Sequence, residues 1–207
     1  MLEELIIRAL ADTLPSEPAD ALFLFGQTED NQASVFATAK LLVKTNQVPR
    51  VMFLNTPPMS GYPGFEAWNA QLQQLGIPAG KLEAIPVPSG TDKLHTLKEA
   101  TAMVHHAKSQ GYRRIFVAAS PFQQPRAFMA AVTAAHRHYP ALYLYSQPGQ
   151  PLAWAEEATH SQGKVEATRA GLIAGEMERI HKYQGIGDLN TVEQVLAYLN
   201  KRDRLGL

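Results

Sequence analysis

The chain has 207 residues, 45% of them hydrophobic, and its 19 lysines and arginines balance its 19 aspartates and glutamates. This length suits a single α/β domain with a sizeable core. A net charge of zero gives no electrostatic case for a nucleic-acid partner, because phosphate binding needs a basic surface. The sequence contains no cysteine, which excludes disulfide frameworks, thiolate metal sites and thiol nucleophiles.

The N-terminal segment, "MLEELIIRALADTLP", spaces its apolar residues as a helix does and carries two glutamates near its start. A secretory signal would begin with positive charge and continue with an unbroken apolar run. No stretch approaches the ~18 consecutive apolar residues of a membrane span. We therefore expect a cytoplasmic protein with no membrane partner.

Five short apolar runs have the composition of buried strands, and four helical patterns separate them. The runs occupy residues 20–26, 50–56, 81–87, 113–120 and 141–147, and the helical patterns occupy residues 29–46, 64–76, 92–111 and 123–138. Runs that are apolar on both faces suit parallel strands covered by helices. The alternation predicts an α/β, Rossmann-like fold: a doubly wound, mainly parallel sheet of about five strands with helices on both faces.

The last third of the chain lacks this alternation. Residues 146–163 are rich in glycine, proline and polar side chains, which predicts a long connection. Helical patterns follow over residues 164–183 and 190–204. No linker divides the chain, so residues 1–207 are predicted to form one Rossmann-like domain with a C-terminal helical extension.

The residues that follow each strand are candidates for a ligand site. In open α/β sheets, ligands bind at the carboxyl ends of the strands, where the strand order reverses. The first turns of the following helices also have unpaired N–H groups that favour an anion. Residues 88–92 form one such loop. The ligand-binding candidates in these loops are Gly26, Gln27, Asn55, Thr56, Ser120, Gln123 and Arg126.

Ser120 and Arg126 are the strongest pair among these candidates. Both lie in "FVAASPFQQPRAF", residues 116–128, where Pro121 and Pro125 restrict the backbone. Arginine offers a planar fork of donors for a phosphate or a carboxylate. The alternative is structural: Ser120 caps the helix, and Arg126 pairs with a nearby acid.

Catalytic residues are less clearly marked. Glu29 and Asp30 could accept hydrogen bonds from a ribose or act as bases, but acids also suit the first turn of a helix. His95 is the histidine nearest the strand ends and the candidate for acid–base chemistry. No His-x-x-x-His spacing with a nearby acid occurs, so we predict no metal site. The first loop has Gly26 where a dinucleotide fingerprint needs three glycines, so ordinary dinucleotide binding is not expected.

Four segments, in this order, resemble the YdcF/SanA/ElyC-like family of domains of unknown function over about residues 18–189. They are "DALFLFGQ", "PRVMFLNT…GFEAWNAQLQQLGIPAGKLEAIPVP", "HTLKEATAMVHHAKSQGYRRIFVAASPFQQPRAF" and "AGEMERIHKYQGIGDL". The resemblance implies a pocket that includes Gly26, Glu66, Thr96, Ser120 and Arg126. One family member is reported to bind S-adenosylmethionine, which makes this the candidate ligand. Gln123 stands where the family has a histidine, and glutamine cannot transfer a proton as histidine does.

Three functional hypotheses remain open. The first is a domain that binds a small nucleotide-like or anionic ligand, with or without catalysis. The second is a hydrolase or transferase of phosphorylated small molecules, in which Ser120 and Arg126 hold the anion and Glu29, Asp30 or His95 transfers a proton. The third is a catalytically degenerate scaffold or oligomer subunit. The sequence decides neither the reaction nor the oligomeric state.

Overall fold

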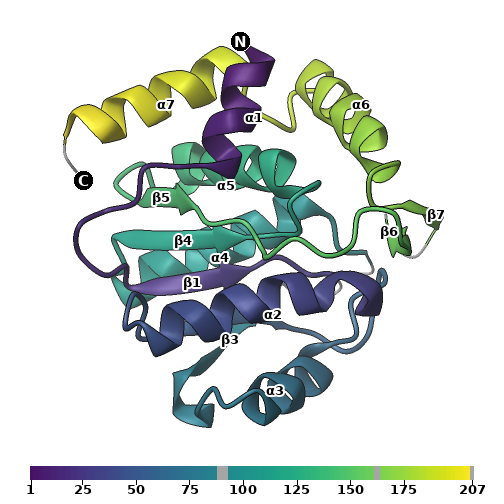
Figure 1. The fold of residues 1–207 in the computed structure, drawn as a ribbon. Helices are drawn as coiled ribbons and strands as arrows, with labels where there is room; N and C mark the ends of the chain where they lie inside the picture. The colour runs from purple at the N-terminus through teal and green to yellow at the C-terminus, as the bar shows by residue number, and fades with distance from the viewer. Residues whose placement is uncertain (88–92, 161–163, 206–207) are drawn as a thin grey trace.

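The computed structural model of the protein describes residues 1–87, 93–160 and 164–205. A five-stranded parallel sheet lies at its centre (Figure 1). Its strands are β1 (Ala21–Leu24), β2 (Val51–Asn55), β3 (Leu82–Pro86), β4 (Arg114–Ala118) and β5 (Tyr143–Ser146). Their order in the sheet is β3-β2-β1-β4-β5. The predicted Rossmann-like, doubly wound fold is confirmed, and each predicted strand is present.

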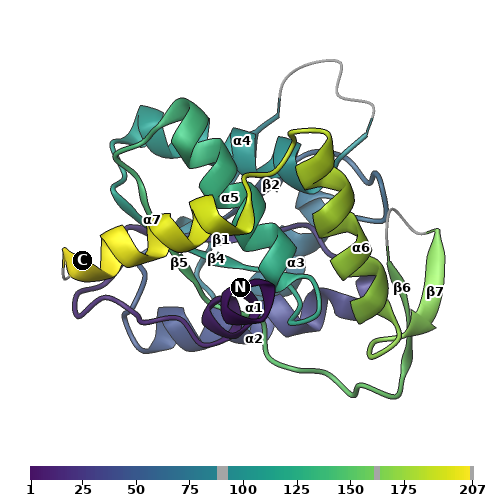
Figure 2. The same ribbon diagram turned by 90° about the horizontal axis from the view of Figure 1, so that it is seen from above.

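Helices cover both faces of the sheet (Figures 1 and 2). They are α1 (Leu2–Leu10), α2 (Glu29–Lys44), α3 (Phe65–Gln74), α4 (Thr96–Gln110), α5 (Gln124–His138), α6 (Leu172–Gly185) and α7 (Val192–Arg204), with a 3₁₀ turn at Ala79–Lys81. Right-handed crossovers place α2 and α3 on one face, and α4 and α5 pack side by side on the other. In the part of the chain that the structure describes, no helix is long and apolar enough to cross a bilayer.

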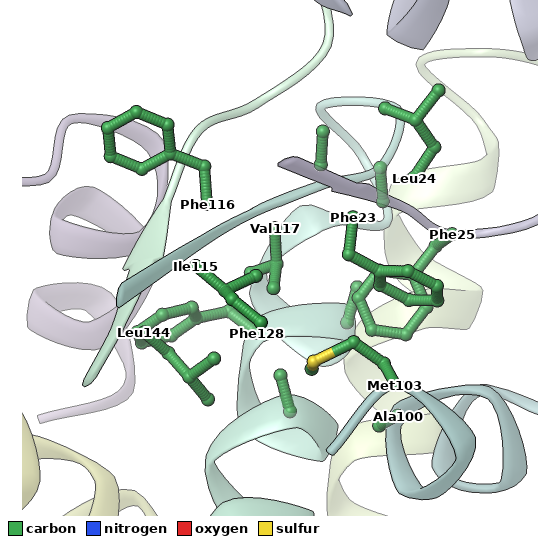
Figure 3. Packing of buried hydrophobic residues seen from close by; sticks show 14 of the residues in the cluster. Phe23, Leu24, Phe25, Ala100, Met103, Ile115, Phe116, Val117, Phe128 and Leu144 are labelled. Atoms are coloured by element: carbon green, nitrogen blue, oxygen red, sulfur yellow. The ribbon is translucent and has the colours of Figure 1, made fainter. Parts of the chain in front are cut away.

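The core lies between the sheet and these helices. Phe23 of β1 and the adjoining Phe25 have ring centroids 4.9 Å apart and point toward Met103 of α4 (Figure 3). Leu24 and Phe116 point to the opposite face (Figure 3). Both faces of the sheet are covered, so every residue of β1 is buried, as is every residue of β4 after Arg114. This burial explains the continuous apolar runs of the two strands.

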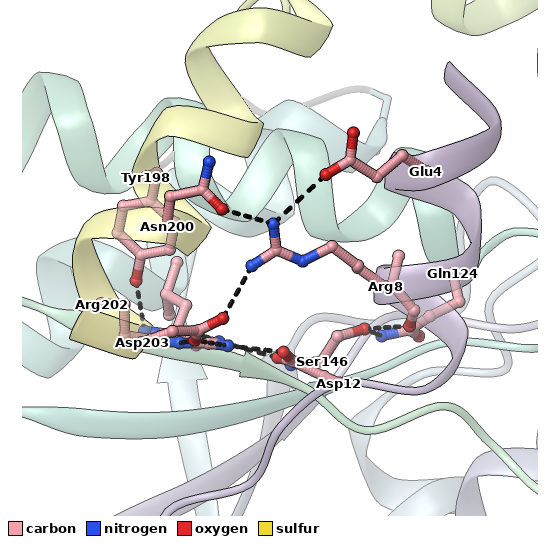
Figure 4. Close-up of polar contacts among 11 residues, drawn as sticks. Glu4, Arg8, Asp12, Gln124, Ser146, Tyr198, Asn200, Arg202 and Asp203 are labelled. Carbon is pink, nitrogen blue, oxygen red and sulfur yellow. Dashed lines mark hydrogen bonds and ion pairs between the residues drawn. The ribbon is translucent and has the colours of Figure 1, made fainter. Parts of the chain in front are cut away.

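The N-terminal and C-terminal helices meet beside α5 (Figure 2). Arg202 of α7 is almost fully buried, and its guanidinium donates to both carboxylate oxygens of Asp12 at 2.5 and 2.7 Å and to the Leu144 carbonyl of β5 at 2.8 Å. At the surface, Arg8 of α1 donates to Asp203 at 2.7 Å (Figure 4). These charged contacts join both ends of the chain to the β5 edge of the sheet.

The prediction of one helix over residues 164–183 is wrong in its first part. Residues Glu157–His160 (β6) and Val165–Thr168 (β7) form an antiparallel hairpin, and α6 begins only at Leu172. The hairpin buries Ala158 against Phe122 and Leu172, a small apolar cluster separate from the main core. This packing, rather than local helix propensity, decides the conformation of the segment.

Candidate functional site

A cavity of about 250 Å³ lies at the carboxyl ends of β1 and β4. The strand order reverses between these two strands, and their register places Leu24 opposite Ala118, so the loops that follow them start at the same level. Such a switch point is the usual ligand site of doubly wound sheets. Six of the predicted residues line the cavity: Gly26, Gln27, His95, Thr96, Gln123 and Arg126.

One wall of the cavity is basic. Arg126, in the first turn of α5, donates from Nε to Glu176 Oε2 at 2.6 Å, from Nη2 to Glu176 Oε1 at 3.2 Å and from Nη1 to Thr96 Oγ1 at 2.5 Å. Glu176 also accepts from His160 at 2.8 Å and from Arg179 at 2.9 Å. The structural alternative for Arg126 is therefore present: it pairs with an acid, and this pairing fixes its guanidinium in the wall.

Glu176 remains ionised at neutral pH. Burial alone would raise its pKa, but the charges and hydrogen bonds of Arg126 and His160 outweigh burial and lower the pKa to about 2. This single carboxylate faces the two guanidinium groups of Arg126 and Arg179. The wall therefore carries an excess of positive charge, and Arg179, only partly buried, brings part of it to the cavity.

Ser120 supports the cavity from behind and does not line it. Its hydroxyl is buried and donates to Gln27 Oε1 at 2.7 Å. Gln27 Nε2 in turn donates to Gln123 Oε1 at 2.9 Å and to the Gly26 carbonyl at 3.0 Å. The structural alternative for Ser120, a helix cap, is not realised, because α5 starts after Gln123 without a side-chain cap. Ser120 thus orients the two glutamines that face the cavity.

The cavity lining also includes a buried acid that sequence reasoning missed. Glu99 is only 6% exposed, and its Oε2 accepts from the Gly26 N–H at 2.7 Å. Burial raises the pKa of Glu99 to about 7, against the opposing effects of the Gly26 N–H and Arg126. A Cβ at position 26 would lie 3.2 Å from this carboxylate oxygen, so glycine permits the close approach. The sequence contained a signal for Glu99: it lies one helical turn after Thr96, so both side chains are on the same face of α4.

The raised pKa of Glu99 predicts a specific pH dependence of stability. The native state holds a proton on Glu99 that the unfolded chain releases near pH 4.5, so stability falls as pH rises from 4.5 through 7. The cost reaches about 3 kcal/mol at pH 8, at ~1.4 kcal/mol per pKa unit. Urea unfolding of wild type and Glu99→Gln at pH 5 and pH 8 measures it. We expect the variant to gain stability relative to wild type by about this amount between the two pH values. If the difference in unfolding free energy between Glu99→Gln and wild type were the same at pH 5 and pH 8, the pKa of Glu99 would not be raised in the native state.

His95 and Tyr62 line the cavity as neutral groups. His95 caps α4, where its Nδ1 accepts from the Lys98 N–H at 3.4 Å, and burial, followed by the charge of Lys98, lowers its pKa. Burial and then the charge of Glu99 raise the pKa of Tyr62, whose hydroxyl donates to the Leu54 carbonyl at 3.1 Å. Both side chains are therefore uncharged at neutral pH.

Glu29 and Asp30 are exposed at the start of α2 and do not line the cavity. Asp30 accepts from the Thr159 N–H at 2.8 Å, and its own carbonyl accepts from the buried Arg169 at 2.7 Å. The first turn of α2 therefore holds the β6–β7 hairpin. This contact matters for the site because the hairpin places His160 on the cavity.

The remaining predicted residues also lie outside the cavity lining. Asn55, at the end of β2, and Glu66, on α3, are exposed. Thr56 is buried, and its Oγ1 has no hydrogen-bond partner among the described residues. The loop after β2 reaches the cavity later in the chain, through Ser60 and Tyr62. The loop of residues 88–92 lies outside the described residues.

Helix α6 supplies further residues that sequence reasoning missed. Glu176, Arg179 and Tyr183 have i, i+3, i+7 spacing, which places them on one helix face. Arg179 and Tyr183 line the cavity, and Glu176 lies behind Arg126. The spacing was a usable signal, but only the fold shows that this face turns toward the strand ends.

The chain matches no protein-family model and no curated protein. The resemblance to YdcF-like domains therefore stays a prediction. In residues 1–87, 93–160 and 164–205, no group of three or more histidine, aspartate or glutamate side chains gathers where it could hold a metal ion. The cavity itself can offer guanidinium, amide and imidazole groups and one carboxylate, that of Glu99.

Proposed function

We propose that this protein binds a small nucleotide-like or anionic ligand in the cavity at the ends of β1 and β4. The observation that carries the proposal is the excess positive charge of the wall, where Arg126 and Arg179 face a single carboxylate, Glu176. A partly buried guanidinium interacts more strongly with an anion than an exposed one, because less water screens it. The position at the switch point of the sheet supports the same conclusion.

The size of the cavity limits the ligand. Its volume of about 250 Å³ is slightly below the ~300–1,000 Å³ usual for small-molecule sites, so it suits a compact polar ligand or the polar end of a larger one. A phosphorylated metabolite and the amino-acid end of S-adenosylmethionine both meet this description. The resemblance to YdcF-like domains favours S-adenosylmethionine for the first test.

Arg179→Ala is expected to weaken binding of an anionic ligand by about ten-fold or more. A hydrogen bond to a charged group contributes about 1.5–3 kcal/mol, and 1.4 kcal/mol corresponds to a factor of ten. Glu176 would keep Arg126 and His160 as partners, so removal of the Arg179 side chain should leave the fold intact. Thermal-shift and calorimetric titrations with phosphate, AMP and S-adenosylmethionine measure the effect, since a ligand at 100 times its Kd adds about 2.7 kcal/mol of stability.

Lys182→Ala is the matched control, because Lys182 is an exposed cation on the same helix. We expect this variant to bind as wild type does. If the wild-type protein bound none of these compounds, or if Arg179→Ala bound them equally well, the proposed site would be wrong. An empty panel would favour the scaffold hypothesis.

The hydrolase or transferase hypothesis has less support from the geometry. The hydroxyl of Ser120 is buried and donates to Gln27, so it is not presented to a ligand as a nucleophile would be. Glu29 and Asp30 lie outside the cavity lining. Binding without these residues acting on the ligand is therefore the simpler proposal.

A further inference from the structure

Glu99 is a buried carboxylate on which the charge of Arg126 acts, but no cation among the described residues is in hydrogen-bond or ion-pair contact with it. In the described part of the chain, its hydrogen bond comes from the neutral Gly26 N–H at 2.7 Å, and it forms no ion pair. Buried carboxylates are normally paired with a cation or held by several donors, because desolvation of a charge is costly. The raised pKa of Glu99 reflects this cost.

The charged and titratable neighbours of Glu99 are already committed to other partners. Arg126 on α5 directs its guanidinium to Glu176 and Thr96. Tyr62, from the loop after β2, donates its hydroxyl to the Leu54 carbonyl and turns its ring toward Gly26. His95, on α4, holds a neutral ring at the helix cap. Within residues 1–87, 93–160 and 164–205, therefore, no cation makes direct contact with the Glu99 carboxylate.

We propose that the ligand is a zwitterion, with its anionic group on the Arg126–Arg179 wall and a protonated amine against Glu99. This inference rests on the proposed function and adds the second charge of the ligand. The face of a neutral tyrosine ring also attracts cations, and Tyr62 lies beside the Glu99 carboxylate. Compact aminoalkyl phosphates and amino acids carry both charges and are small enough for a cavity of about 250 Å³.

Matched ligand pairs test the inference. Phosphoethanolamine and ethyl phosphate differ by one amine, as do β-alanine and propionate. At pH 8, calorimetric or NMR titration of the full chain should show about ten-fold tighter binding of the amine-bearing member in a pair that binds, equivalent to 1.4 kcal/mol. In Glu99→Gln the ratio of the two Kd values in a pair should fall to about one, while the Kd of ethyl phosphate stays within about three-fold of the wild-type value.

A second measurement does not depend on any variant. In the wild-type protein the ratio should fall several-fold between pH 8 and pH 6, because Glu99 takes up a proton in this range. Each pair shares the same anionic group, so titration of that group largely cancels in the ratio. Glu66→Gln, which removes an exposed carboxylate on α3, is the control and should leave the ratio unchanged.

The outcomes separate this inference from the proposed function. If ethyl phosphate binds as tightly as phosphoethanolamine and Arg179→Ala weakens both, the zwitterion inference is wrong and the anion site stands. If the preference for the amine survives in Glu99→Gln, the cation lies elsewhere and the inference is again wrong. If none of the four compounds binds, the inference and the anion site fail together for these ligands.

Discussion

Glu176→Gln is expected to lower the free energy of unfolding by about 3–5 kcal/mol, the usual effect of removing one partner from a buried ion pair. The Glu176 side chain is fully buried, and its carboxylate accepts from Arg126 at 2.6 and 3.2 Å and from His160 at 2.8 Å. A glutamine cannot neutralise Arg126, so the guanidinium would be left buried without a counter-charge. Urea unfolding at pH 7 measures the loss.

The same carboxylate predicts acid sensitivity. Its native pKa near 2 lies below the ordinary value of 4.5, so its contribution is fully present above pH 4.5 and is lost as pH falls toward 2. The difference corresponds to about 3 kcal/mol at ~1.4 kcal/mol per pKa unit. The wild-type protein should therefore lose its advantage over Glu176→Gln between pH 5 and pH 2.

Two further variants decide whether the buried charge explains the effect. Glu178→Gln removes an exposed carboxylate from the same helix and should change stability by less than about 0.5 kcal/mol. The double variant Arg126→Met/Glu176→Met removes both charges and should recover most of the loss, because apolar replacements of buried ion pairs are often neutral. A loss below about 1 kcal/mol in Glu176→Gln would show that the pair does not hold α6 in place.

The architecture of the sheet could be predicted because its signals are local. Each strand is a continuous apolar run buried between two helical layers, and each helix has its own period, so short windows of sequence suffice. The β6–β7 hairpin could not be predicted in the same way. Its conformation depends on Asp30 and Arg169, which bond to backbone groups more than a hundred residues away in the sequence.

Sequence reasoning identified several of the residues that line the cavity but not how their side chains pair. The rule that ligands bind at strand ends pointed to Gly26, Gln27 and Arg126, and the structure places all three on one cavity. The same rule could not show that Arg126 pairs with Glu176, 50 residues later, or that Ser120 turns away toward Gln27. Charge pairing across the fold depends on tertiary geometry, which a single sequence does not encode in any short window.

Arg202→Met should also destabilise the protein by about 3–5 kcal/mol. The substitution would leave the buried Asp12 carboxylate without its guanidinium partner, which donates to it at 2.5 and 2.7 Å (Figure 4). The Leu144 carbonyl would lose a donor at 2.8 Å, and the ring of Tyr145 would lose a cation 4.4 Å from its centroid. Urea unfolding measures the total effect, and hydrogen exchange should show reduced protection in α7 first.

The control for this variant is Arg204→Met, since Arg204 is an exposed residue on the same helix and, among the described residues, bonds to the Asn200 carbonyl one turn away. We expect the free energy of unfolding of Arg204→Met to remain within about 0.5 kcal/mol of wild type.

Ligand binding separates the two predictions. Because Arg202 lies at the β5 edge and does not line the cavity, Arg202→Met should bind ligand as wild type does under conditions in which the variant is folded. Glu176→Gln should instead change ligand affinity, because Glu176 holds both arginines of the basic wall. If folded Arg202→Met bound ligand more weakly than wild type, the β5 edge of the sheet and the cavity would be coupled, and the cavity would not be an independent site.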